Sequence, residues 1–276
     1  MKEFFLKNHK VDCDQAVHLG SGVWWVGFQD EEGGLHCNPY LIIDGDEAVV
    51  IDGGSRPDFP TVMMKILETG LSPARIGALI YDHYDPDLCG SITNFEEMIG
   101  RPDLKLISTA FSHTFIRHYG SKSAFSSISQ LDYRYVFKSG RSLEFITTPY
   151  CHSQGSFVIF DPKTKILFSG DLFGTYDRNW QLFMAFPEGC AGGQPCEICA
   201  NNGRQCRING HVEFHKMLMP STRALHHALA KLKDLPFEIV ASQHGSILDR
   251  RSALILLNKL MHTTDIGIDN IAAEKS

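Results

Sequence analysis

Six side chains of the kind that bind metal ions follow four strand-like segments of this 276-residue chain. His83, Asp85 and Asp87 alternate directly after the first of these segments. Alternate residues of an extended segment point the same way, so one imidazole and two carboxylates can converge there. Three later strand ends supply the other candidates, which are His152, Asp171 and His244.

The charge of these six groups indicates what they would bind. Three carboxylates and three neutral imidazoles sum to −3, and two divalent cations bring +4, so one bridging hydroxide would balance the cluster. Burying three uncompensated carboxylates is not feasible, whereas a balanced cluster can be buried. Carboxylates and imidazoles without thiolate suit iron or manganese at least as well as zinc. Taken singly, each residue would be interpreted as a hydrogen-bonded histidine or a helix-capping aspartate. Their occurrence at four strand ends favours a dinuclear metal site.

Strands dominate the elements that must position these residues. Residues 40–43 and 48–51 are apolar and flank Asp44-Gly45-Asp46, which predicts a hairpin. Residues 59–69 and 222–235 have helical spacing of apolar residues. Further buried strands are expected at 76–81, 104–108, 143–147, 157–160, 166–169 and 237–241. This alternation favours an α/β fold in which helices cover the outer faces of sheets.

Composition excludes several classes of protein. The chain is 43% hydrophobic, which is enough apolar material for a sizeable core. Its net charge is −6 and it has no block of Lys or Arg, so we expect no nucleic-acid partner. No apolar run approaches the ~18 residues of a membrane span, and the N-terminus is charged too early for a signal peptide. We therefore expect one cytoplasmic domain over residues 1–276, with no membrane partner.

One stretch, residues 187–210, contains almost no aliphatic residues but holds four cysteines, Cys190, Cys196, Cys199 and Cys206. We interpret it as an inserted loop that adds little to the core. In a reducing compartment such a cluster binds metal more often than it forms disulfides. Four thiolates could hold an iron–sulfur cluster, one zinc ion or one iron ion, and the alternative is four free thiols. We favour a 4Fe–4S cluster, because it would supply a redox relay.

The combined motif resembles the metallo-β-lactamase superfamily, and within it the flavodiiron proteins and the related oxygen-binding diiron proteins. The flavodiiron pattern is His-x-Glu-x-Asp, a distant His, an Asp after eighteen intervening residues, and a final His. Here the corresponding residues are His83, Asp85, Asp87, His152, Asp171 and His244. The resemblance extends from about Val23 to Arg251, interrupted by the cysteine-rich stretch.

By this resemblance the fold is an αββα sandwich with a diiron centre at one edge of the paired sheets. Asp171 would bridge the two irons. His83, Asp85 and His152 would complete one iron, and Asp87 with His244 the other. Leu88 stands where the family commonly has another His, so the second iron should have a more open position. The chain to Ser276 has no room for the flavodoxin-like domain, so we expect no FMN in it, and we expect a homodimer.

Three functions remain open from the sequence. The first is a diiron oxidoreductase that reduces O2 or NO, with electrons entering from a redox partner through the cysteine cluster. The second is an oxygen-sensing diiron protein that binds O2 without turnover and signals to a partner protein. The third is a dinuclear metallohydrolase, disfavoured because Asp85 and Leu88 stand where hydrolases have His. Two phenols, those of Tyr84 and Tyr176, could donate hydrogen bonds to bound oxygen, although simple packing is the alternative for each. We expect His211 and His215 to be surface or packing residues.

Overall fold

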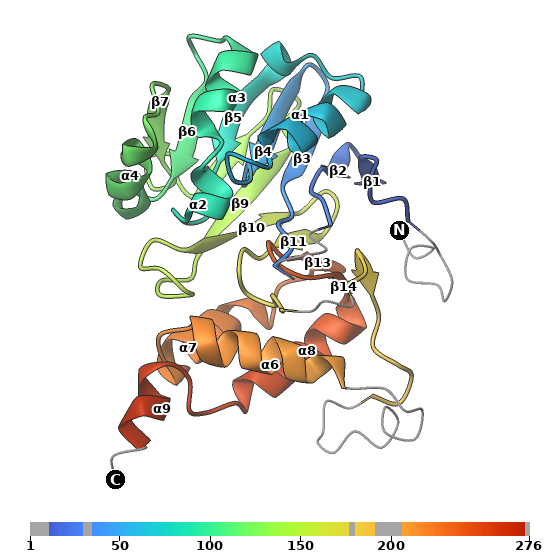
Figure 1. Ribbon diagram of the computed structural model, residues 1–276, viewed down its shortest axis with the longest axis vertical. Coiled ribbons are helices and arrows are strands. Elements are labelled where there is room, and N and C mark those ends of the chain that lie inside the picture. The colour runs from blue at the N-terminus through green and yellow to red at the C-terminus, as the bar shows by residue number, and fades with distance from the viewer. Residues whose placement is uncertain (1–10, 30–34, 177–179, 191–205, 274–276) are drawn as a thin grey trace.

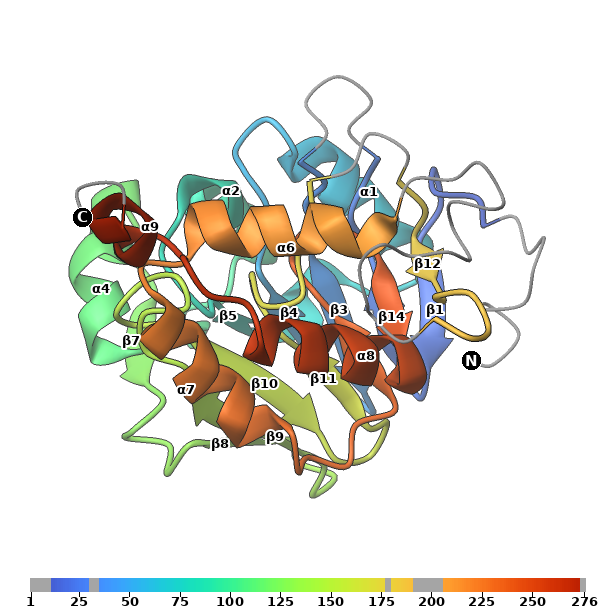
Figure 2. The same cartoon turned by 90° about the horizontal axis from the view of Figure 1, so that it is seen from below.

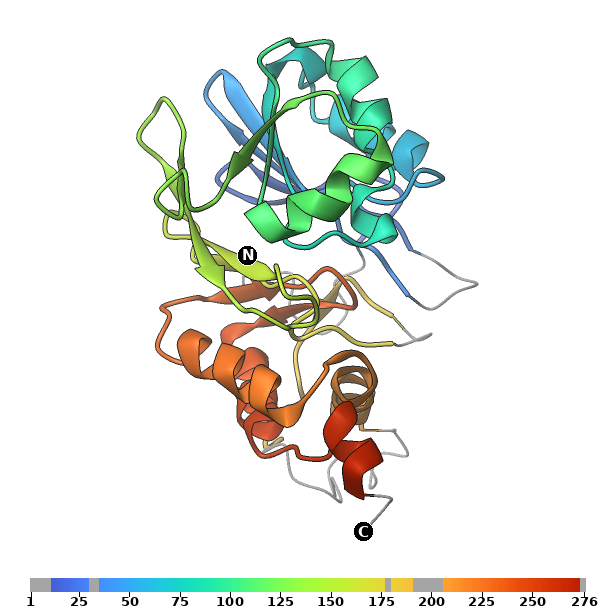
Figure 3. The same cartoon turned by 90° about the vertical axis from the view of Figure 1, so that its left-hand side faces the viewer.

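Two seven-stranded sheets face each other in the computed structural model, and helices cover the outer face of each (Figure 1, Figure 3). The structure describes residues 11–29, 35–176, 180–190 and 206–273. The αββα sandwich expected from the resemblance is confirmed by this arrangement.

The first sheet has its strands in chain order, with antiparallel pairing from β1 to β4 and parallel pairing from β4 to β7. Its strands are β1 (Val17–Gly20), β2 (Val23–Trp25), β3 (Tyr40–Asp44), β4 (Glu47–Ile51), β5 (Ile76–Ile80), β6 (Lys105–Ser108) and β7 (Ala124–Ser127). The predicted hairpin is β3–β4, in which Asp44 pairs with Glu47 across a turn where Gly45 has a positive φ of 59°. That conformation suits glycine.

The second sheet has the order β12-β14-β13-β11-β10-β9-β8. Its strands are β8 (Arg134–Val136), β9 (Ser142–Thr147), β10 (Phe157–Asp161), β11 (Ile166–Phe168), β12 (Phe183–Met184), β13 (Ile239–Ala241) and β14 (Ile247–Asp249). Both β9 and β11 are antiparallel to β10, and β13 is parallel to β11. The carboxyl ends of β9, β11 and β13 therefore lie at the same edge of the sheet.

Helices form the two outer layers. Those on the side of the first sheet are α1 (Phe59–Glu68), α2 (Pro86–Cys89), α3 (Ile92–Ile99) and α4 (Ala110–Ile116). Those on the side of the second sheet are α6 (Arg207–Leu218), α7 (Thr222–Leu232), α8 (Arg250–Met261) and α9 (Ile268–Ala273) (Figure 2). Short 3-10 turns cover Pro73–Arg75 and Arg117–Tyr119.

Three apolar clusters correspond to the three interfaces between these four layers. Trp25, Tyr40 and Phe168 belong to the cluster between the sheets. A second cluster joins the second sheet to α6, α7 and α8, and a third joins the first sheet to α1 and α3. Burial on both faces explains why the central strands have continuous apolar runs rather than alternating ones.

The structure contains elements that the sequence interpretation did not name. They include strands of four residues or fewer, which are β1, β7, β8, β12 and β14, and the helices α4 and α8. The stretch 187–210 was expected to add little core, but α6 already begins at Arg207. Both Cys190 and Ile208 are buried in the cluster beneath the outer helices. Within the described residues, no helix has the length and apolar character needed to cross a membrane.

A buried ion pair ties the sheets together at the edge away from the predicted metal ligands. Arg141, just before β9, pairs through Nη2 with Asp161 at the end of β10, and both side chains are almost fully buried. Its Nη1 donates a hydrogen bond of 2.9 Å to the carbonyl of Ser21 and lies 3.6 Å from Asp44 of β3. One guanidinium thus contacts both sheets.

Replacing this guanidinium should destabilise the fold. We expect Arg141→Met to lower the free energy of unfolding by about 3–5 kcal/mol, because Asp161 would remain buried without a cation. Urea unfolding followed by circular dichroism measures the change. The matched control is Arg134→Met, whose exposed pair with Glu144 at 3.5 Å should contribute at most about 1 kcal/mol. Equal effects of the two substitutions would contradict this account.

Candidate metal centre

The six predicted ligand residues meet at one edge of the paired sheets. Segment 82–87 follows the carboxyl end of β5. The other three residues, His152, Asp171 and His244, follow the carboxyl ends of β9, β11 and β13. Because these three strands run in one direction, their loops emerge side by side and face the loop after β5.

Asp171 lies at the centre of the cluster. His152 Nε2 is 3.1 Å from its Oδ2, and His244 Nε2 is 3.4 Å from its Oδ1. His83 Nε2 lies 3.8 Å from Oδ1. Two ligands about 2.1 Å from one ion and at right angles to each other lie ~3 Å apart, so these separations suit ligands that share metal ions.

The remaining carboxylates divide the cluster into two halves. Asp85 Oδ2 lies 3.1 Å from His152 Nε2 and 3.9 Å from His83 Nε2. Asp87 Oδ2 lies 3.2 Å from His244 Nε2. Asp171 Oδ2 faces His152 of the first half and Oδ1 faces His244 of the second, with His83 of the first half also nearest to Oδ1. Such a placement between the two halves suits a bridging carboxylate.

Hydrogen bonds to the outer nitrogens orient two of the imidazoles. His83 Nδ1 is 2.5 Å from Asp82 Oδ1, and His244 Nδ1 is 3.0 Å from the carbonyl oxygen of His36. A carbonyl only accepts, so His244 Nδ1 donates. Metal-binding histidines commonly use this arrangement, which turns the other nitrogen toward the metal.

Three buried atoms of the cluster make no hydrogen bond within the described part of the chain. They are His83 Nε2, His152 Nε2 and Asp171 Oδ1. Leaving a buried polar atom without a partner costs about 1–3 kcal/mol each. Cations between these atoms would satisfy all three, so the residues fit a metal centre.

The pKa values of the ligand residues reflect an excess of negative charge in the cluster. Burial by itself would lower the pKa of His83, but the Asp171 and Asp82 carboxylates raise it well above its ordinary value. His152 behaves likewise, and Asp171 and Asp85 raise its pKa to about 9. Burial would raise the pKa of Asp171, yet His83 and His244 hold it well below its usual range. Without metal, the imidazoles must carry protons to compensate the carboxylates.

Residues that were not predicted support the Asp171 loop. Gly170 has a positive φ of 54°, and a side chain there would collide with the carboxylate of Asp82. His215 of α6 is fully buried. Its Nε2 accepts a 3.1 Å hydrogen bond from the backbone N–H of Phe173, and its Nδ1 lies 2.7 Å from the carbonyl oxygen of His211. Burial lowers the pKa of His215 to about 4, so it stays neutral and can accept this bond.

His211 also contacts this loop, since its Nδ1 lies 2.9 Å from the carbonyl oxygens of Phe173 and Gly174. His211 and His215 were expected to be surface or packing residues. Both are fully buried, and both also orient the loop after Asp171. The i, i+4 spacing of the two histidines on one helix was the available signal.

Two further groups near the ligands were not singled out by their sequence context. Asp82 was passed over because it precedes the alternating motif. Cys37 lies just before β3, and its Sγ is 3.8 Å from Asp87 Oδ2. Nothing in the local sequence around Cys37 signals that proximity.

The two tyrosines lie at the periphery. The Tyr84 ring stacks on Phe115 with centroids 4.5 Å apart, and Tyr176 is 50% exposed. Among the described residues, neither hydroxyl makes a hydrogen bond to a ligand residue. Their role as donors to bound oxygen stays a prediction.

The cysteine-rich stretch is described only at its ends. Cys190 is buried, and Cys206 is half-buried immediately before α6. Cys196 and Cys199 lie outside the described residues, so the predicted cluster and the loop boundaries of 187–210 stay predictions.

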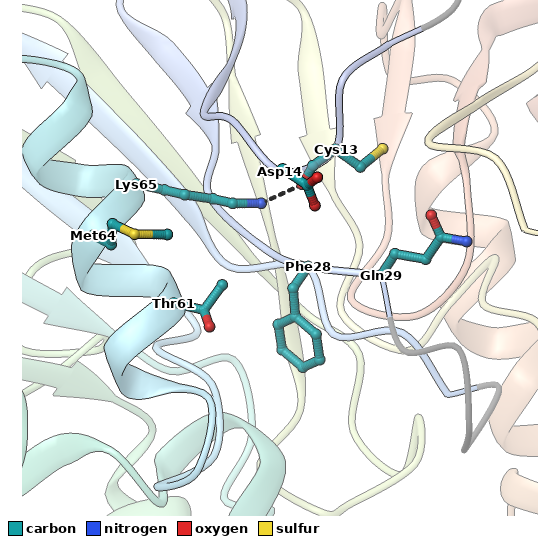
Figure 4. A pocket seen from close by; sticks show the side chains of 7 residues that line it. All are labelled: Cys13, Asp14, Phe28, Gln29, Thr61, Met64 and Lys65. Atoms are coloured by element: carbon teal, nitrogen blue, oxygen red, sulfur yellow. Dashed lines mark hydrogen bonds between the residues drawn. The ribbon is translucent and has the colours of Figure 1, made fainter.

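A separate cavity of about 310 Å³ lies beside α1 (Figure 4). Its lining residues are Cys13, Asp14, Phe28, Gln29, Thr61, Met64 and Lys65. The Lys65 ammonium donates hydrogen bonds to the carbonyl oxygens of Cys13 and Gly27 and lies 4.4 Å from the centre of the Trp25 ring. These contacts anchor the N-terminal segment to α1, so the lysine has a structural role.

Comparison with known proteins agrees with the fold. The family model described as "ODP family beta lactamase" matches residues 35–245. The chemotaxis sensor ODP from T. denticola, in its apo state, has a TM-score of 0.72 and 21% identity. That match covers 94% of this chain and 97% of the sensor. The flavodiiron protein from Giardia intestinalis has a TM-score of 0.72 and 20% identity, covering 92% of this chain and 59% of that one.

Among curated proteins, a "Putative diflavin flavoprotein A 1" from Nostoc sp. strain PCC 7120 is 24% identical over 222 residues. That alignment covers 78% of this chain and 34% of the flavoprotein. The chain thus spans about a third of the length of this relative. At these identities the structural likeness establishes the fold alone.

The raised histidine pKa predicts how the metal-free protein responds to pH. A group whose pKa is higher in the folded state stabilises the fold fully below its unfolded value and ceases to do so above its folded value. For His152 these limits are 6.5 and about 9. After metal removal by chelation, the free energy of unfolding should therefore fall between pH 6.5 and 9, by about 1–3 kcal/mol.

Chemical unfolding across this pH range measures the effect. His152→Gln should make this decline shallower without abolishing it, because the pKa of His83 and that of His244 are also raised. The matched control His262→Gln, at an exposed helix end, should leave the profile unchanged. A metal-free protein that becomes more stable from pH 6.5 to 9 would contradict the described electrostatics.

Proposed function

The chain belongs to the ODP family of β-lactamase-like proteins, and we propose that it is a non-haem diiron protein that binds or reduces O2 or NO. The observation that carries this proposal is the convergence of three imidazole nitrogens on the two oxygens of Asp171, at 3.1, 3.4 and 3.8 Å. A buried carboxylate surrounded in this way is suited to bridge two cations.

Each half of the cluster would hold one ion. His83, Asp85 and His152 would bind the first, and Asp87 with His244 the second, with Asp171 shared between them. Bound iron is redox-active and would supply the electrons that O2 or NO accepts. Zinc is redox-inactive and would not supply them.

The chain's own residues fix the site before any ligand arrives. Asp82 and the His36 carbonyl hold two imidazoles with Nε2 facing inward. His215 holds the backbone after Asp171. Such outer contacts typically affect metal affinity or activity 10- to 100-fold.

Access to the site is uneven. His83, Asp171 and His244 are almost fully buried, whereas the side chains of Asp85 and Asp87 are 30% and 27% exposed. A diatomic molecule would therefore enter past these two carboxylates. The opening is also the side from which protons could be delivered.

Turnover would need electrons beyond those of the metal pair. Complete reduction of O2 to two water molecules takes four electrons and four protons. We propose that Cys190, Cys196, Cys199 and Cys206 hold a 4Fe–4S cluster that relays electrons from a redox partner. The proposal is supported by the four thiols within one short stretch.

The alternative function is oxygen sensing without turnover. It is supported by the family model described as "ODP family beta lactamase", which matches residues 35–245, together with the likeness to the chemotaxis sensor ODP. A sensor would bind O2 and pass the change to a signalling partner. A homodimer is proposed for either function.

Metal analysis of the anaerobically purified protein tests the proposal. We expect iron with acid-labile sulfide, and zinc without iron would contradict the diiron function. Iron without sulfide would retain the diiron centre but refute the iron–sulfur relay.

Asp171→Asn should abolish binding of the iron pair, because the amide cannot bridge two cations as a carboxylate does. The exposed control Asp103→Asn should keep its iron. Oxygen consumption with a chemical reductant then separates the two functions. Steady consumption indicates a reductase, and a stable oxygen-bound spectrum without consumption indicates a sensor.

A further inference from the structure

Cys37 lies against the half of the metal centre that has fewer ligands. Its Sγ is 3.8 Å from Asp87 Oδ2, and the ligand atoms of Cys37, Asp87 and His244 all lie within 4.8 Å of one another. The cysteine is 5% exposed. Among the described residues, this trio and the trio His83, His152 and Asp171 are the two groups whose geometry could hold a metal ion.

The residues before and after Cys37 make contacts that hold it next to His244. The preceding residue, His36, accepts the hydrogen bond from His244 Nδ1. The following residue, Asn38, is fully buried, and its Nδ2 donates to the carbonyl oxygens of Ser242 at 3.0 Å and Gly245 at 2.8 Å. The segment around Cys37 is therefore attached to the same loop that carries His244.

We propose that the Cys37 thiolate is a direct ligand of the second metal ion, beside Asp87, His244 and the bridging Asp171. This inference rests on the proposed dinuclear centre. An oxygen ligand about 2.1 Å and a sulfur ligand about 2.3 Å from one tetrahedral ion lie ~3.6 Å apart. The observed separation of 3.8 Å between Sγ and Oδ2 is close to that value.

Ligand numbers favour this assignment. In the proposed centre the first ion would have four protein ligands, His83, Asp85, His152 and Asp171. Without Cys37 the second would have three. Leu88, at the position where the family resemblance would place a further imidazole, is fully buried in the apolar cluster of the first sheet. Cys37 restores four protein ligands from a different segment of the chain.

A Cys37 thiolate would also balance the charge of two divalent ions. Binding replaces the thiol proton by the metal, so R–SH and M²⁺ give R–S–M⁺ and H⁺. The four anionic ligands then sum to −4, which two divalent ions neutralise without a bridging hydroxide. The alternative is that Cys37 remains a thiol and only donates a hydrogen bond to Asp87.

Cobalt(II) binding distinguishes a ligand from a hydrogen-bond donor. A thiolate bound to Co(II) gives a sulfur-to-metal charge-transfer absorption, which a thiol does not. Titration of the full chain with Co(II) should show a component of this absorption that Cys37→Ala removes. The distant control Cys13→Ala should retain it. Thiolates of the cysteine-rich stretch contribute equally to all these proteins, so they cancel in the difference.

Affinity provides the second measurement. Cys37→Ala and Cys37→Ser should both weaken Co(II) binding at the second site by about 10- to 100-fold or more, since loss of an outer contact alone costs that much. A Cys37→Ser protein with wild-type affinity would overturn the proposal, because serine keeps the hydrogen bond to Asp87. Unchanged charge-transfer absorption in Cys37→Ala would overturn it as well.

The failure of the dinuclear centre itself would look different. In that case Asp171→Asn would leave the Co(II) stoichiometry of the chain unchanged, and the proposed function and the Cys37 assignment would both be refuted. Loss of Co(II) in Asp171→Asn with no charge-transfer change in Cys37→Ala would refute the Cys37 assignment alone.

Discussion

The buried Asp171 carboxylate lies among three imidazoles, with the partly buried carboxylates of Asp85 and Asp87 beside it, and the whole site depends on positive charge that neutralises this cluster. Asp171 is the strictest case, since its side chain is 3% exposed and its Oδ1 makes no hydrogen bond within the described residues. Protons on the histidines can compensate the charge in the metal-free protein. Two divalent cations would do so while also satisfying the unpaired nitrogens, which is why the cluster is best understood as a metal centre.

The fold meets this constraint by strand direction. Loops at the carboxyl ends of β9, β11 and β13 lie at one edge, opposite the loop after β5, so four distant segments deliver their side chains to one place. The contacts that fasten the sheets at the other edge, centred on Arg141, involve none of the ligand residues. The chemistry at one edge can therefore vary while the packing between the sheets is maintained.

Much of this arrangement was predictable from the sequence, and the exceptions have physical causes. Ligands such as His83 and Asp171 were found because their spacing follows strand ends, and most apolar strands were found because burial on two faces gives continuous apolar runs. Cys37 and His215 were not assigned to the site, because they reach it from segments distant in sequence, through contacts that only tertiary packing creates. The four clustered cysteines of 187–210 were evident as a pattern, but cysteine spacing alone does not determine which metal, if any, they bind.

Anomalous diffraction at the iron absorption edge, from crystals grown with Fe(II) under anaerobic conditions, tests the central claim most directly. The account predicts two iron peaks at the edge of the paired sheets, one bound by His83, Asp85 and His152 and the other beside Asp87 and His244, with Asp171 between them. A single iron peak at this edge, or no iron beside Asp171, would contradict the account, whereas additional iron at the cysteine-rich stretch would not.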